Sequence, residues 1–238
     1  MISKLFHLSK LFFIGALFTI VSTSQLHASE EGFNMKEQAI IPIAAFAANG
    51  DIPNLQKSLN EGLDSGLTIN QIKEVLSQVY AYAGFPRSLN ALAAFMQVVE
   101  ERKEKGLKDE VGASSSALPT DRTSLSFGTD NQTKLIGVEV KGPLFDFAPQ
   151  IDEYLKAHLF GNIFERDLLS WREREIATIS MLATIPGVNS QLASHYNISM
   201  NNEVTESELQ QFISILNTHC GEQIANNAQQ VLDSVLNK

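Results

Sequence analysis

The stretch GLTINQIKEVLSQVYAYAGFPRSLNALAAFMQVVEE, residues 66–101, decides the fold class. Thr68 stands three residues before Gln71, which is the spacing of a capping box at the start of a helix. Apolar residues then recur at positions 69, 72, 75, 76 and 79, and this three-to-four spacing indicates an amphipathic helix. The stretch therefore predicts packed helices rather than strands.

The C-terminal half of the chain repeats this punctuation 137 residues later. Thr205 and Glu208 form a second capping box at the matched place, and Asn34-x-x-Glu37 has a partner in Ser170-x-x-Glu173. We therefore expect an all-α protein of two tandem, related helical bundles. The first covers residues 29–105 and the second residues 145–238.

Residues 106–144 separate the two bundles and are rich in Gly, Ser, Thr and Asp. Such a composition predicts a long polar loop that acts as a linker, a lid or an arm for a neighbouring subunit. The short run KLIGVEV, residues 134–140, is the one weak strand prediction in the chain.

Residues 1–28 have the pattern of a secretory signal peptide. Lys4 and Lys10 precede the apolar run at 11–21, and Ala28 provides a small residue for cleavage. We expect an exported protein, periplasmic or secreted, with no membrane segment after cleavage. An uncleaved membrane anchor is the alternative.

Charge and cysteine content exclude several classes of function. The chain has 238 residues and a formal net charge of −9, which argues against sequence-independent binding of nucleic acid. Cys220 is the single cysteine, so an internal disulfide, a thiolate zinc site and a two-thiol redox pair are all excluded.

Both halves resemble the carboxymuconolactone decarboxylase family, which includes the alkylhydroperoxidase D-type proteins. The resemblance rests on residues 66–101 and on LLSWREREIATISMLATIPGVNSQLASHYNISMNNEVTESEL, residues 168–209. It implies an all-helical fold, ring-like homo-oligomers such as trimers or hexamers, and a pocket where helices and subunits meet.

The resemblance also points to candidate residues. In the alkylhydroperoxidase branch the active helix carries Cys-x-x-Cys-x-x-x-His, with a Glu one helix earlier. His195 and Glu175 match the His and the Glu, but Val188 and Gln191 stand where the cysteines would be. Thiol-dependent peroxide reduction needs thiolates. An antioxidant function is therefore a disfavoured alternative, and Cys220 alone does not restore it.

The remaining chemistry is acid–base catalysis. A carboxylate that orients a His leaves the ring to move protons near neutral pH. We expect a cofactor-free, lyase-type enzyme for a small anionic, lactone-like or enolisable substrate. His195 would be the acid–base and Glu175 its orienter, with Arg172 or Arg174 holding the substrate. Catabolism of aromatic rings is normally cytoplasmic, which counts against muconolactone itself for an exported chain.

Several alternatives stay open at this stage. Glu175 with either arginine could only brace a helix start, and the protein could be a non-catalytic oligomer that binds a small molecule. His219 is a weaker catalytic candidate, because a cation at the end of a helix is the simpler interpretation. His158 fits packing or an oligomer contact. We expect no metal site, because no two histidines have His-x-x-x-His spacing.

The first bundle lacks these titrating groups, which suggests one working site per chain. The positions equivalent to Glu175, His195 and His219 are occupied by Gln38, Ser58 and Tyr82.

Overall fold

The computed structural model describes residues 32–237, so the expected signal peptide lies outside the described residues. The described residues contain helices and no strand, which confirms the all-α prediction. The helices are α1(Met35–Asn49), α2(Ile52–Asp64), α3(Ile69–Gln78), α4(Tyr80–Glu104), α5(Ser124–Ile136), α6(Pro143–Phe147), α7(Pro149–Glu153), the π-helix η1(Tyr154–Ile163), α8(Trp171–Thr184), α9(Asn189–Asn201), α10(Glu206–Cys220) and α11(Glu222–Leu236).

Helices α1–α4 and α8–α11 are two copies of one arrangement. The capping boxes predicted at Thr68 and Thr205 are both present. Gly84 (φ 82°, ψ 161°) breaks α4, and Gly221 (φ 91°, ψ 164°) stands between α10 and α11 in the same conformation. Glycine adopts such angles far more readily than other residues. The tandem repeat therefore extends to the backbone geometry at Gly84 and Gly221, although in the first copy the break falls inside α4.

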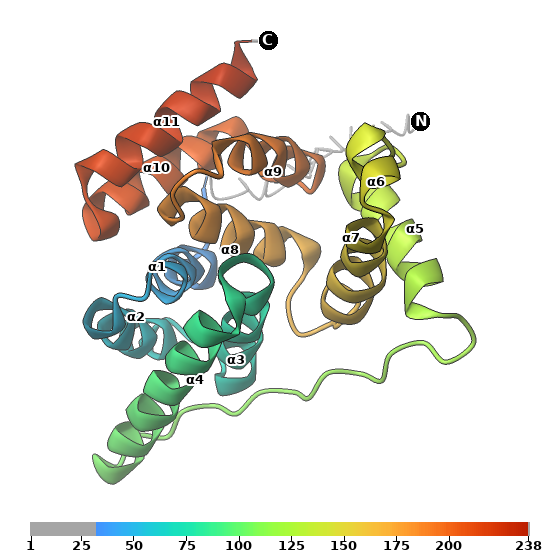
Figure 1. The fold of residues 1–238 in the computed structure, drawn as a ribbon. Coiled ribbons are helices and arrows are strands. Elements are labelled where there is room, and N and C mark those ends of the chain that lie inside the picture. Colours follow the sequence, from blue (N-terminus) through green and yellow to red (C-terminus); the bar gives the residue numbers. More distant parts are fainter. Residues whose placement is uncertain (1–31, 238) are drawn as a thin grey trace, which may run out of the picture.

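The two copies share one hydrophobic core. Helices α1 and α8 lie together at its centre, with α2–α4 on one side and α9–α11 on the other (Figure 1). All residues at 40–48 of α1 and 174–183 of α8 are buried. A helix that is apolar around its whole circumference belongs inside a protein, and this explains the central place of α1. Helix α8 is central although it also buries Arg174, Glu175, Thr178 and Ser180.

An arm, defined here as residues 124–164, projects from this body (Figure 1). Helices α5 and η1 approach closely at Gly128, which has no side chain. A Cβ at this position would lie only 1.9 Å from the Lys156 carbonyl oxygen. Their small core contains Leu135, Leu159, Phe160 and Phe164, together with Ile198 of α9. The weak strand prediction at 134–140 is wrong, since the run begins in the last turn of α5 and continues outside any regular element.

The non-helical segment 107–123, here called the connector, leads from α4 to the arm along one side of the body (Figure 1). Its Glu110 and Val111 carbonyl oxygens accept hydrogen bonds from the Ile69 and Asn70 amides, at 2.9 and 3.0 Å. These amides are in the first turn of α3, where a helix has no internal partners for them. The connector therefore completes the start of α3.

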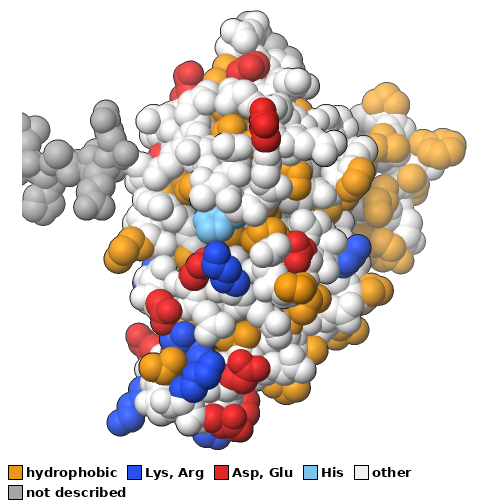
Figure 2. All heavy atoms as spheres, turned by 90° about the vertical axis from the view of Figure 1, so that its left-hand side faces the viewer, with side chains coloured by type: hydrophobic (Ala, Val, Ile, Leu, Met, Phe, Trp, Pro, Cys, Tyr) orange, Lys and Arg blue, Asp and Glu red, His pale blue; other side chains and the backbone are white. Residues whose placement is uncertain are grey.

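Apolar side chains on the arm stay exposed. Leu144, Phe147, Ile151 and Tyr154 are each at least 46% exposed. Figure 2 shows hydrophobic side chains gathered on a projecting edge, while charged side chains are scattered over the face in view. No helix within residues 32–237 is long and apolar enough to cross a membrane.

Candidate acid–base site

Glu175 and His195 form a direct pair between α8 and α9. His195 Nδ1 lies 2.7 Å from Glu175 Oε2. The Glu175 side chain has no exposed surface, whereas 13% of the His195 side chain is exposed. Because Nδ1 faces the carboxylate, Nε2 is the nitrogen left to exchange a proton with a solute. The structure therefore brings together the two residues that the sequence singled out.

The second oxygen of Glu175 is unusual. Oε1 is buried and has no hydrogen-bond partner among the described residues. Native proteins satisfy most buried polar atoms, because an unpaired buried acceptor costs about 1–3 kcal/mol. Unsatisfied buried groups are concentrated where function requires them. The carboxylate thus has an acceptor to spare beside the imidazole.

Tyr82 of the first repeat completes the surroundings of His195. The two ring centroids are 6.0 Å apart, with the rings edge to face. The Tyr82 hydroxyl lies 3.2 Å from Thr178 Oγ1. Burial raises the pKa of this hydroxyl above its ordinary value of 10.0, and the nearby Glu175 carboxylate raises it further. The site therefore lies at a junction between the two repeats, and Tyr82 stays protonated near neutral pH.

Arg172 and Arg174 are both engaged inside the protein. Arg172 donates to Glu37 at 2.7 Å, to Glu208 at 2.5 Å and to the Glu203 carbonyl oxygen. The Arg174 side chain is fully buried and donates a hydrogen bond to Glu74 at 2.8 Å. Their substrate-binding role stays a prediction, and this geometry favours the alternative of structural bracing.

A family model described as "Carboxymuconolactone decarboxylase family" matches residues 15–97 and 149–234. The chain belongs to this family. The two matched regions correspond to the two repeats, and the connector, α5 and α6 lie between them. A similar protein is an uncharacterized protein of Methanocaldococcus jannaschii, 30% identical over 67 residues. Those residues are 28% of this chain and 63% of that protein, so the chain spans less than two thirds of this relative's length.

In this family member His219 is not part of the Glu175–His195 pair. It is exposed at the end of α10 and lines a separate hollow with Gln38 and Ser58. His158 is also exposed, and its Nδ1 lies 3.0 Å from Asn162 Nδ2. The geometry therefore supports one imidazole, that of His195, as the candidate acid–base.

The positions that carry cysteines in the alkylhydroperoxidase branch of the family offer no thiol here. Val188 precedes α9 and Gln191 lies in its first turn. Burial raises the pKa of the Cys220 thiol to about 11, so little thiolate forms at neutral pH. Thiol-dependent peroxide reduction therefore has no nucleophile at the expected place.

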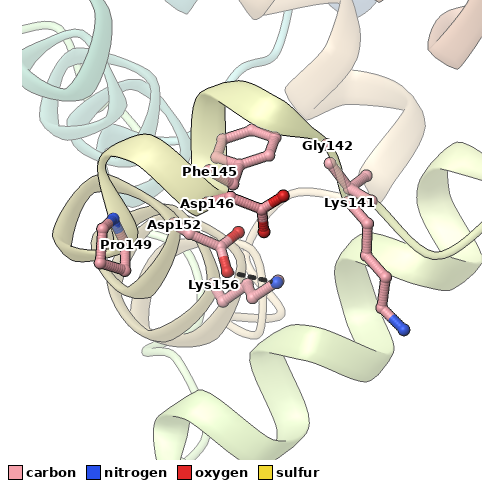
Figure 3. Close-up of a pocket in the computed structure, with 8 residues that line it drawn as sticks. Lys141, Gly142, Phe145, Asp146, Pro149, Asp152 and Lys156 are labelled. Atoms are coloured by element: carbon pink, nitrogen blue, oxygen red, sulfur yellow. Dashed lines mark hydrogen bonds and ion pairs between the residues drawn. The ribbon is translucent and has the colours of Figure 1, made fainter.

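A hollow of about 760 Å³ lies on the arm (Figure 3). Lys156 Nζ donates to Asp152 at 2.6 Å, while the Lys141 side chain extends away from this pair (Figure 3). The titratable side chains lining it are Lys141, Asp146, Asp152 and Lys156. None of these residue types ordinarily titrates near neutral pH. The Glu175–His195 pair is therefore the better candidate for proton transfer.

Proposed function

We propose that the protein is a cofactor-free acid–base enzyme of the lyase type. Its substrate would be a small anionic molecule that is lactone-like or otherwise enolisable. The observation that carries this proposal is the 2.7 Å contact between buried Glu175 and partly exposed His195. A family with mixed activities supplies the fold, and this pair supplies the chemistry.

In the proposed reaction the bond between the carboxylate carbon and its neighbour breaks. Carbon dioxide leaves, and the electron pair enters the conjugated carbonyl system as an enolate. Imidazolium at His195 then donates its proton to carbon, and the neutral ring takes another proton from water. Net, the carboxylate and one proton become carbon dioxide and the protonated product. Glu175 orients the imidazole and stabilises its charged form.

The test uses the full-length protein and a panel of small β-keto acids and unsaturated lactone acids in heavy water. Carbon dioxide release and deuterium at carbon report the two steps. His195→Ala should lower kcat/KM by about 100-fold or more, because general acid catalysis contributes 10²–10⁴. Glu175→Gln should lower kcat more than it changes KM, since it positions the ring without touching substrate.

His158→Ala is the matched control, because it removes an exposed imidazole that has no carboxylate partner. Its kcat/KM should equal that of the unmodified protein. Turnover that survives His195→Ala at the original rate would rule out the proposed mechanism.

A second candidate is a non-catalytic protein that binds a small apolar molecule. A groove of about 440 Å³ favours it, lined mainly by apolar groups with Tyr80, Tyr154 and His158 among them. If ligand binding persists in His195→Ala and no substrate is turned over, this candidate replaces the enzyme.

We also propose export from the cytoplasm, on the basis of the pattern in residues 1–28. A mature N-terminus at residue 29 in the extracytoplasmic fraction would support it. Full-length protein in the soluble cytoplasm would contradict it.

A further inference from the structure

A small hollow, here called the second hollow, lies at the other junction between the repeats, where Gln38 and Ser58 take the places of Glu175 and His195. It encloses about 190 Å³ between α1, α2 and the end of α10. Its polar lining consists of Gln38, Ser58, Glu61, Ser65 and His219. Helices α1 and α10 pack directly on each other, so the two walls belong to different repeats.

This hollow is the repeat-related counterpart of the acid–base site. Gln38 and Ser58 stand 137 positions before Glu175 and His195, and His219 stands 137 positions after Tyr82. Each junction thus takes two side chains from one repeat and a ring from the other. The fold builds two equivalent places, which have diverged in chemistry.

The arm accounts for a difference between the two junctions. Ile198, the counterpart of Glu61, belongs to the small core that the arm forms with α9. Glu61 lines its hollow, and its side chain is 47% exposed. The second junction therefore presents a carboxylate to solvent where the first has an apolar contact.

Two hydrogen-bond donors in this hollow already have partners. Gln38 Nε2 donates to the Phe33 carbonyl oxygen at 2.7 Å, and Ser65 Oγ donates to the Glu61 carbonyl oxygen at 2.8 Å. The Gln38 side-chain oxygen and the Ser65 hydroxyl oxygen keep lone pairs that can accept a further hydrogen bond. Ser58 is 2% exposed and lines this hollow, and its hydroxyl oxygen can accept a hydrogen bond. The hollow therefore has acceptors to offer.

The charge of Glu61 and the volume of the hollow limit which ligands can bind there. The Glu61 carboxylate has one ion-pair contact among the described residues, to Lys57 at 3.8 Å, and 72% of that lysine side chain is exposed. Met35 and Pro42 provide an apolar wall. A hollow of about 190 Å³ has room for several waters or for one small solute. This suits a ligand of roughly six to eight non-hydrogen atoms.

We propose that this second hollow binds a small organic cation, a primary ammonium on a short apolar chain. The ammonium donates to Glu61, Ser58 and the Gln38 carbonyl oxygen, and the chain packs on Met35 and Pro42. The formal net charge of −9 favours cations around the whole molecule. This site is separate from the proposed catalytic pair.

The test titrates the full-length protein with pentylammonium and follows its amide resonances by NMR. We expect saturable, millimolar binding, with shifts at Gln38, Ser58 and His219. Pentanol and hexanoate, which match its size without the positive charge, should not saturate these shifts. Glu61→Gln should weaken binding about fivefold, the upper range for an exposed ion pair.

Three matched variants complete the experiment. Glu104→Gln removes another exposed acid, at the end of α4, and should leave the Kd unchanged. Ser58→Ala should weaken binding about threefold through one lost hydrogen bond. His195→Ala should bind normally, so failure of the proposed enzyme function would not affect this result. The absence of saturation, equal binding of pentanol, or an equal loss in Glu104→Gln would each overturn the proposal.

Discussion

Glu74 links the two repeats through two arginines. Its Oε1 accepts from Arg166 Nε and Arg174 Nη2, each at 2.8 Å. Burial opposes ionisation of Glu74, but the hydrogen bonds from both arginines outweigh it and hold the pKa of the carboxyl below its ordinary value of 4.5. Arg174 also donates to Gln78 Oε1 at 3.0 Å. The buried guanidinium therefore depends on a residue of the first repeat.

Glu74→Gln should destabilise the protein by about 3 kcal/mol, because it leaves a buried guanidinium without its ionic partner. The carboxylate stabilises the fold above its ordinary pKa, and this contribution is lost as the pH falls below about 4.5. Urea unfolding at neutral and acidic pH should show that the difference in unfolding free energy between the unmodified protein and Glu74→Gln becomes smaller in acid. Glu104→Gln, the exposed control, should change stability by less than about 0.5 kcal/mol. A difference that becomes larger in acid would contradict this account.

Sequence reasoning identified part of the site at this scale. The pairing of Glu175 with His195 could be predicted from family spacing alone. Tyr82 was missed, although its equivalence to His219 was visible in the repeat. The positions of Arg172 and Arg174 could not be predicted, because their partners Glu37 and Glu74 are 135 and 100 residues away. Helix periodicity gives no information on such contacts.

At the scale of elements, the helices were largely predictable and the arm was not. A capping box fixes the start of a helix by local hydrogen bonds. The starts of α3 and α10 can therefore be predicted from one four-residue motif each. Helix α5 lies within the stretch assigned to a polar loop. Residues 154–163 of η1, within the range assigned to the second bundle, pack on α5 instead. Tertiary contacts between Gly128 and the η1 backbone decide this arrangement, and the local pattern does not encode them.

Gly221 tests the break between α10 and α11. Its φ of 91° and ψ of 164° are strained for any residue with a Cβ, although a Cβ there would meet no atom within 4 Å. Gly221→Ala should therefore cost about 1–3 kcal/mol through backbone strain alone. Thermal unfolding measures the loss. Asn226→Ala, an exposed change within α11, should leave the melting temperature almost unchanged. Equal stability of the two variants would show that the break tolerates a side chain.

At the scale of the whole molecule, we propose that the exposed apolar side chains of the arm meet a second copy of the chain. Phe147 is 87% exposed and Leu144 is 66% exposed. Tyr80, stacked on the exposed Phe85 at 4.4 Å, joins Tyr154 and Ile151 around one apolar groove. Large exposed apolar patches on a protein usually mark an interface. The exposed Phe147 ring of one copy can insert into this apolar groove of another copy.

Phe147→Asp should therefore shift the protein toward monomers in analytical ultracentrifugation, because a charge in an apolar interface is costly to desolvate. Val111→Asp introduces the same charge at a 59% exposed position on the connector and should leave the mass unchanged. A monomeric unmodified protein, or equal masses for both variants, would exclude the arm as the interface.

The connector crosses the outside of the body and is the covalent link between helix groups that already share a core. A protease nick near Ser115 would separate two polypeptides without removing a buried side chain, since residues 113–117 are exposed or only partly covered. Co-expressed fragments divided there would each bring one of the central helices, α1 or α8. They should reassemble into the native fold, because α1 and α8 belong to one hydrophobic core.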